Sequence, residues 1–171
     1  MNPLTERKVQ QILGKKLFLR KVCIPNVLMW RPHNTEYEAD FIYFDLKTRY
    51  VTEVEIKTSI EDFRRDFQKD HRHDNCNVKY LYYAVPTELY TEHKDEILSA
   101  IGPNGLILIT YRVRDNGILI ERADFEKRAK ARKAVIPLNQ NKLEYFMKIG
   151  CMKWVSRYVE PISIRNDKKE G

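Results

Sequence analysis

Residues 53–59 read EVEIKTS, and this stretch decides the fold. Its charged residues Glu53, Glu55 and Lys57 occupy every second position, with apolar residues between them. Because successive side chains of a strand point to opposite faces, the alternation predicts a strand with one charged face and one apolar face. Any half-exposed antiparallel strand has this pattern, so these residues alone do not assign a function.

The segments on either side of this stretch define its surroundings. Residues 37–45, YEADFIYFD, and residues 50–58, YVTEVEIKT, are predicted to be two strands joined by a short polar turn. Ser59 and Asp62, three residues apart, form a capping box that predicts a helix directly after the second strand. The charged strand is therefore expected to end beside a helix N-terminus.

Hydrophobic spacing and turn residues predict the other elements. They are helices at 3–19, 88–101, 127–133 and after Pro137, with a break at Gly150, and strands at 26–30, 80–85, 105–111 and 117–121. This order predicts an α/β (α+β mixed) fold. The order of its core is α-β-β-β-α-β.

The length of 171 residues favours one domain, which we place at residues 1–160. Within it, residues 36–110 form the expected core and residues 123–160 a C-terminal helical part, and residues 161–171 are expected to be a loose tail. Three widely spaced cysteines, a polar N-terminus and the lack of a long apolar run predict a cytoplasmic protein with no membrane segment.

The formal charge of +7 is unevenly distributed along the chain. Residues 1–35 have a net charge of +6, whereas residues 36–58 have a net charge of −3. An acidic island in a basic chain suits a metal site surrounded by a surface that attracts nucleic acid. An ordinary basic protein with scattered solvated charges remains the alternative at this point.

Asp40 changes the interpretation of the charged strand. It lies in a strand that is apolar on both faces, where a carboxylate is costly unless a cation or a hydrogen-bond donor meets it. If the strands at 37–45 and 50–58 are neighbours, Asp40 and Glu55 lie side by side, and a divalent metal would relieve their repulsion. Lys57, about 7 Å further along the same face, could then orient a water molecule or stabilise developing charge. These are the parts needed to hydrolyse a phosphodiester.

The spacing of Asp40 and the EIK at residues 55–57 resembles the core signature of the PD-(D/E)XK nuclease superfamily. The likeness continues through EVEIKTSIEDFRRDFQKDHRH, YLYYAVP and GLILI. This whole stretch is similar to a bacterial and phage subgroup close to the MmcB-like DNA-repair proteins. It covers about residues 36–110. Ala39 stands where many members have proline.

The resemblance implies a restriction-endonuclease-like core, with a central mixed sheet of four to five strands flanked by helices. It also implies Mg²⁺ (or Mn²⁺) as cofactor and DNA as substrate, in repair, recombination or phage DNA processing. Asp40, Glu55 and the backbone carbonyl of Ile56 would be metal ligands, and Lys57 the catalytic lysine. Glu6 matches the glutamate that many members bring to the site from their first helix. A catalytically silent nucleic-acid-binding module on the same fold is the alternative, and a homodimer is possible in either case.

Several cations are candidate nucleic-acid contacts: Arg64, Arg65, Lys69, Lys127 and Arg128. A solvated helix surface explains them about equally well. For Glu53 we keep two interpretations, an acid that supports the site and an exposed surface glutamate. The motif HRHDNC at residues 71–76 lacks paired ligands at both ends, so zinc is not favoured.

Overall fold

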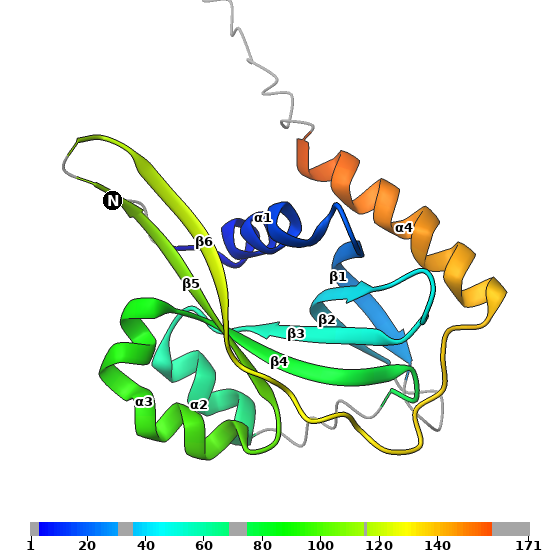
Figure 1. The fold of residues 1–171 in the computed structure, drawn as a ribbon, viewed down its shortest axis with the longest axis horizontal. Helices are drawn as coiled ribbons and strands as arrows, with labels where there is room; N and C mark the ends of the chain where they lie inside the picture. Colours follow the sequence, from blue (N-terminus) through cyan, green and yellow to red (C-terminus); the bar gives the residue numbers. More distant parts are fainter. Residues whose placement is uncertain (1–3, 31–35, 69–74, 115, 159–171) are drawn as a thin grey trace, which may run out of the picture.

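The computed structural model describes residues 4–30, 36–68, 75–114 and 116–158. Within them the chain forms an α/β mixed fold of four helices and a six-stranded sheet (Figure 1). In chain order the elements are α1 (Glu6–Leu17), β1 (Val22–Trp30), β2 (Glu36–Phe44), β3 (Val51–Ile56), α2 (Ile60–Gln68), β4 (Val78–Pro86), α3 (Thr87–Ile101), β5 (Gly105–Val113), β6 (Leu119–Lys127) and α4 (Gln140–Tyr158). No helix in these segments is both long and apolar enough to cross a membrane.

The sheet is open, and its spatial order β1-β2-β3-β4-β5-β6 follows the chain. The pairs β1–β2, β2–β3 and β5–β6 are antiparallel. The pairs β3–β4 and β4–β5 are parallel, and their connections carry α2 and α3 respectively. The carboxyl ends of β3, β4 and β5 therefore lie at one edge of the sheet.

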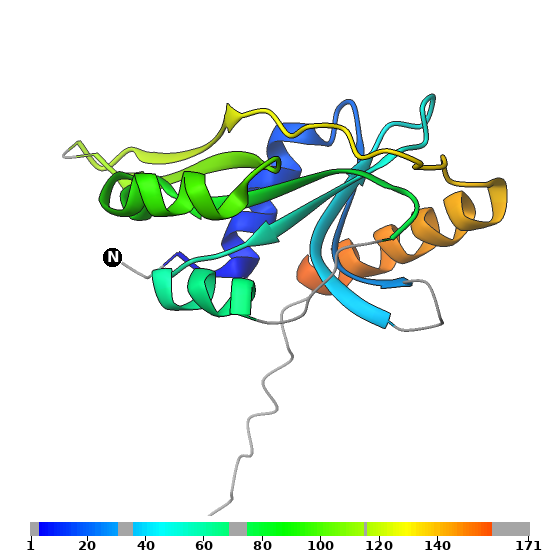
Figure 2. The same ribbon diagram turned by 90° about the horizontal axis from the view of Figure 1, so that it is seen from below.

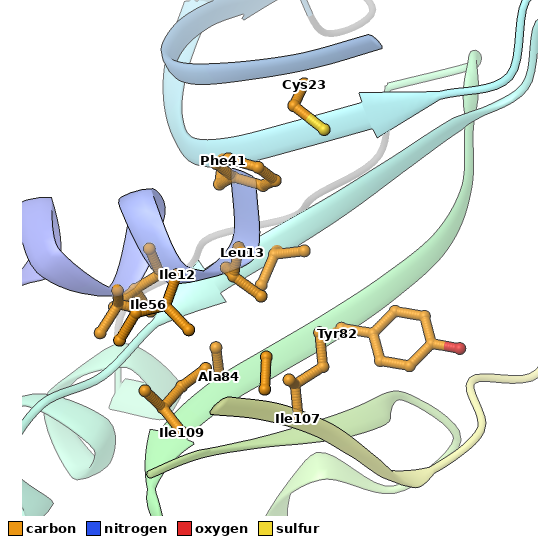
Figure 3. Close-up of a cluster of buried hydrophobic side chains, with 12 residues drawn as sticks. Ile12, Leu13, Cys23, Phe41, Ile56, Tyr82, Ala84, Ile107 and Ile109 are labelled. Carbon is orange, nitrogen blue, oxygen red and sulfur yellow. The ribbon is translucent and has the colours of Figure 1, made fainter. Parts of the chain in front are cut away.

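Opposite faces of β3 pack against different helices. On one face, Ile56 packs with Phe41 of β2 and with Ile12 and Leu13 of α1 (Figure 3). On the other face, Glu53 and Glu55 share a side with the β4 residues Leu81 and Tyr83, which pack against α2 and α3. Figure 2 shows α4 along β1 and β2, at the end of the sheet opposite to α3. The charged side of β3 therefore faces α2.

Local signals predicted the element types well, and the capping box is confirmed because the Asp62 N–H donates to Ser59 Oγ at 3.2 Å. The sheet has six strands instead of four or five, since β1 and β6 are both full edge strands. The prediction of a break at Gly150 is wrong, because α4 runs through it. A Cβ at this glycine would lie 3.2 Å from Ile24, so its small size permits close packing on β1.

The predicted basic helix at 127–133 is also wrong. Lys127 ends β6, and residues 128–139 form neither helix nor strand. Several of their N–H groups instead donate to carbonyls of other loops and of β4. For example, the Lys130 N–H donates to the Pro103 carbonyl and the Arg132 N–H to the Lys79 carbonyl, both at 2.9 Å. Like charges at helical spacing with no acid between them disfavour a helix here. The C-terminal helical part therefore begins at Gln140, not at residue 123. The expected tail lies outside the described residues.

Candidate active site

Asp40 and Glu55 are neighbours across β2 and β3, as the hairpin predicted. The register pairs Phe41 with Val54, which places Asp40 opposite Glu55 one step further along. The Ile56 N–H donates to Asp40 Oδ2 at 2.7 Å. A backbone donor from β3 thus orients the Asp40 carboxylate beside the end of that strand.

Lys57 lies between two carboxylates. Its Nζ donates to Glu55 Oε2 at 3.2 Å and to Asp66 Oδ1 at 2.8 Å. All three side chains are at least nine-tenths buried, with exposed fractions of 8%, 6% and 8% for Lys57, Glu55 and Asp66. The Tyr83 hydroxyl, at 3.5 Å, donates to the other oxygen of Asp66. The ammonium is therefore held in a shielded pair of ionic contacts.

Asp66 is a member of this cluster that sequence reasoning did not single out. It lies on α2, three residues after Phe63, whose ring is buried against Tyr83. Residues three apart share a helix face, so the position of Asp66 beside the inward-facing Phe63 was the available signal. An aspartate on the packed side of a helix needs a cation or donor, and Lys57 supplies one.

Glu6 reaches the same region from the first turn of α1. Its Oε1 accepts from Gln10 Nε2 at 2.8 Å and from Asn26 Nδ2 at 2.9 Å. Gln10 Nε2 also donates to the backbone carbonyl of Asp40 at 2.8 Å. Buried Gln10, another residue not identified from the sequence, therefore connects the Glu6 carboxylate to the strand that carries Asp40.

The electrostatics of the cluster perturb two groups in particular. Burial raises the pKa of Asp40 to about 6, the Ile56 N–H opposes this shift, and the nearby Glu6 carboxylate adds to it. Burial would lower the pKa of Lys57, but the Glu55 and Asp66 carboxylates outweigh it, so the pKa is raised and the lysine stays an ammonium ion. Lys57 can thus donate hydrogen bonds but is a poor proton acceptor.

Glu53 is fully buried, with an exposed fraction of 0%. The interpretation as an exposed surface glutamate is therefore wrong. The Tyr37 hydroxyl donates to Glu53 Oε2 at 2.6 Å. Burial, followed by the charge of Glu53, raises the pKa of Tyr37, so the phenol stays a donor. Glu53 lies on the same face of β3 as Glu55, opposite Ile42 of β2.

The donor set suits a hard divalent cation. No group of three or more histidine, cysteine, aspartate or glutamate side chains in the described segments forms a ready metal site. Asp40, Glu55 and the Ile56 backbone carbonyl nevertheless provide oxygen ligands of the kind that Mg²⁺ prefers. The raised pKa of Asp40 indicates an acidic, buried setting in which a nearby cation would favour the carboxylate. These residues therefore fit Mg²⁺, provided that Glu55 shares its carboxylate between the metal and Lys57.

The candidate nucleic-acid contacts lie in different settings. Arg64 forms two hydrogen bonds to Glu96 of α3, at 2.7 and 2.9 Å, so its guanidinium is already engaged. Lys127 donates to the Gly102 carbonyl at the end of α3, a favourable place for a cation. Arg65 and Arg128 are exposed. Lys69, like His71 and His73, lies outside the described residues, and Cys76 is exposed.

A hollow of about 690 Å³ lies elsewhere, between α1 and α4. Its walls are largely apolar and include Gly14, Cys23, Met147 and Trp154. The Trp154 indole N–H donates to the Cys23 carbonyl at 2.6 Å, which closes one side of it. The buried charged groups lie in the acidic cluster, so this cluster rather than the apolar hollow is the candidate active site.

Comparison with known proteins found no matching family model, no matching curated protein and no matching solved structure. The fold and the site together define an α/β protein with an open mixed sheet and a buried cluster of acids around one lysine.

Proposed function

We propose that the protein is a Mg²⁺-dependent nuclease that hydrolyses phosphodiester bonds in DNA, with a restriction-endonuclease-like core of the PD-(D/E)XK superfamily. The observation that carries the proposal is the cluster of Asp40, Glu55 and Lys57 at the end of β3. Its order along the chain, acid and then acid-x-lysine on the next strand, also supports the superfamily assignment.

Asp40, Glu55 and the Ile56 carbonyl would hold the metal. When bound, Mg²⁺ would neutralise phosphate oxygens and lower the pKa of a coordinated water. Asp40 would contribute its carboxylate from β2, where the Ile56 N–H fixes its orientation. Glu6 would add negative charge from α1 and receive its orientation from Gln10 and Asn26.

Lys57 would act as a hydrogen-bond donor and a positive charge. Its raised pKa keeps the ammonium protonated at neutral pH, so it would orient the attacking water or stabilise charge on the phosphate oxygens. Asp66 would keep the ammonium in place when Glu55 turns towards the metal, because the lysine has both partners. A proton acceptor for the water must come from elsewhere, such as a carboxylate or the substrate phosphate.

The test is cleavage of linear duplex, single-stranded, flap and four-way-junction DNA with Mg²⁺ or Mn²⁺, mapped at nucleotide resolution. We expect Lys57→Ala and Asp40→Asn to abolish cutting while DNA affinity measured in EDTA is retained. Lys148→Ala, which removes an exposed lysine on α4, is the matched control and should cut like the wild type.

Metal-dependent cleavage by purified Lys57→Ala would contradict the assignment. If the wild type cuts none of the four substrates but binds DNA in a salt-sensitive manner without any need for Mg²⁺, the protein is a nucleic-acid-binding module instead.

A further inference from the structure

The end of β5 and the start of β6, residues 110–113 and 119–122, form a two-stranded ribbon that extends past the rest of the sheet. The last pair between β4 and β5 is Pro86 with Ile109, whereas β5 and β6 stay paired out to Val113 with Leu119. In Figure 1 this two-stranded ribbon runs past α1 and projects beyond the edge at which β3 ends. The ribbon therefore projects from the edge of the sheet that carries the candidate active site.

The base of the ribbon is fixed to α1. Glu121 of β6 accepts from Lys8 Nζ at 3.1 Å and from Lys15 Nζ at 2.5 Å. Lys8 also lies over the ring of Tyr111 of β5, 5.4 Å from its centroid. Hydrogen bonds from Lys15 and Lys8 lower the pKa of Glu121, so these contacts persist at neutral pH. Because α1 also carries Glu6, one helix sets the position of the ribbon relative to the site.

Beyond this base the ribbon presents two arginines to solvent. Arg112 and Arg114 are exposed and, with Val113 and Asn116, line a hollow of about 460 Å³. Neither guanidinium forms an ion pair within the described segments. Arg122, by contrast, donates to Asp124 at 2.5 Å. Two guanidinium groups that have no ion pair in the described part of the chain and lie beside a polar hollow favour an anionic partner with repeated charges.

The register gives the distance from the arginines to the site. Glu55 pairs with Tyr83, and Tyr83 pairs with Leu106, so these three residues form one row across the sheet. Arg112 lies six residues further along β5, roughly 20 Å at the usual rise of a strand. A nucleic-acid strand covers that distance with about six phosphates.

We propose that the β5–β6 ribbon is an arm that holds duplex DNA, with Arg112 on a backbone phosphate about six base pairs from the bond to be cut and Arg114 on a phosphate beyond it. The proposal rests on the proposed function for the position of the cut, but the arm can be tested by binding alone. A two-stranded ribbon fits the major groove of a duplex. Single-strand binding surfaces stack bases on open aromatic rings, and the one ring among the projecting residues 110–113 and 119–122, Tyr111, is covered by Lys8.

The test is fluorescence anisotropy with a labelled 20-base-pair duplex and its single strand, measured in EDTA from 50 to 200 mM salt. Loss of two phosphate contacts reduces the salt slope by about 1.8, so Arg112→Gln/Arg114→Gln should bind the duplex about 60-fold more weakly at 0.1 M salt. The control is Arg20→Gln/Lys148→Gln. It removes the same charge from two exposed positions, Arg20 shortly after α1 and Lys148 on α4, and should keep most of the duplex affinity.

Duplex binding by the arginine variant within about twofold of the wild type would overturn the arm, as would an equal loss on the single strand. If Ile118→Ser/Leu119→Ser abolishes binding and the arginine variant does not, apolar contacts and not phosphates hold the partner, and the proposal fails. Cleavage assayed separately distinguishes the two proposals. If the wild type does not cut DNA but its duplex binding needs Arg112 and Arg114, the arm is supported and the nuclease is rejected. If the wild type cuts DNA but its duplex binding does not need these arginines, the nuclease is supported and the arm is rejected.

Discussion

Asp40→Asn should stabilise the metal-free protein at neutral pH. The pKa of Asp40 is raised from 3.8 to about 6, chiefly by burial. A shift of about two units corresponds to roughly 3 kcal/mol of free energy that the ionised carboxylate costs the folded state. An asparagine amide is neutral, and its oxygen can still accept from the Ile56 N–H that Asp40 Oδ2 binds at 2.7 Å.

The sign follows from proton linkage. A raised carboxyl pKa means that the folded state holds the proton more tightly than the unfolded state does. The contribution of Asp40 is therefore fully present below about pH 4 and is lost as the pH rises from about 4 to about 6. The variant has no such group, so it should match the wild type near pH 4 and exceed its unfolding free energy by up to about 3 kcal/mol at pH 8.

The assay is urea unfolding at pH 4, 6 and 8 in EDTA, repeated with excess Mg²⁺. Asp45→Asn is the control, because the N–H of Lys47 and then the ammonium of Lys21 lower the pKa of this partly exposed carboxyl, so its removal should not stabilise. Bound Mg²⁺ should stabilise the wild type but not Asp40→Asn. A variant no more stable than the wild type at pH 8 in EDTA would refute the burial argument, and equal stabilisation of both by Mg²⁺ would refute the ligand assignment.

Three further substitutions probe the neighbouring contacts. Asp66→Asn removes one of the two carboxylates that hold Lys57. If Lys57 acts as proposed, this variant should slow Mg²⁺-dependent DNA cleavage at least tenfold with little change in melting; unchanged cleavage would exclude a positioning role. Tyr37→Phe removes a donor to buried Glu53 and should lower the unfolding free energy by about 1–3 kcal/mol in urea, a neutral result being the contrary outcome. A Cβ at Gly105 would lie 2.2 Å from the Tyr82 ring. Gly105→Ala should therefore lower the free energy of unfolding by about 1–3 kcal/mol and the Tm by about 2–12 °C in calorimetry. An equal or higher Tm would contradict this packing.

The features that could be predicted from the sequence depend on local periodicity. The alternation of Glu53, Glu55 and Lys57 gave the strand, and the capping box at Ser59 gave the start of α2. A short turn between two strands makes them antiparallel neighbours, which was enough to place Asp40 beside Glu55. Neither result needs knowledge of how distant segments pack.

The features that were missed depend on packing between elements. Asp66 reaches Lys57 only because α2 lies across the end of β3 at a particular angle, which no spacing in the sequence specifies. Glu53 has the same alternation as Glu55, but the Tyr37 hydroxyl of β2 donates to it and the surrounding elements remove it from solvent. The basic segment at 128–139 is held by carbonyls of distant loops and of β4, contacts that the spacing of its residues does not specify.

The charge balance of the cluster connects the two proposals. Asp40, Glu55 and Asp66 surround one cation, Lys57, and Glu6 adds further negative charge from α1. A DNA phosphate entering this site would be repelled unless another cation came with it. An arm outside the cluster has no such requirement, so duplex binding in EDTA should come from the ribbon, and seating of the backbone at the acids should need a divalent ion. A cation that does not support cleavage, such as Ca²⁺, should then strengthen duplex binding by the wild type but not by Asp40→Asn, because only the wild type retains both acidic ligands.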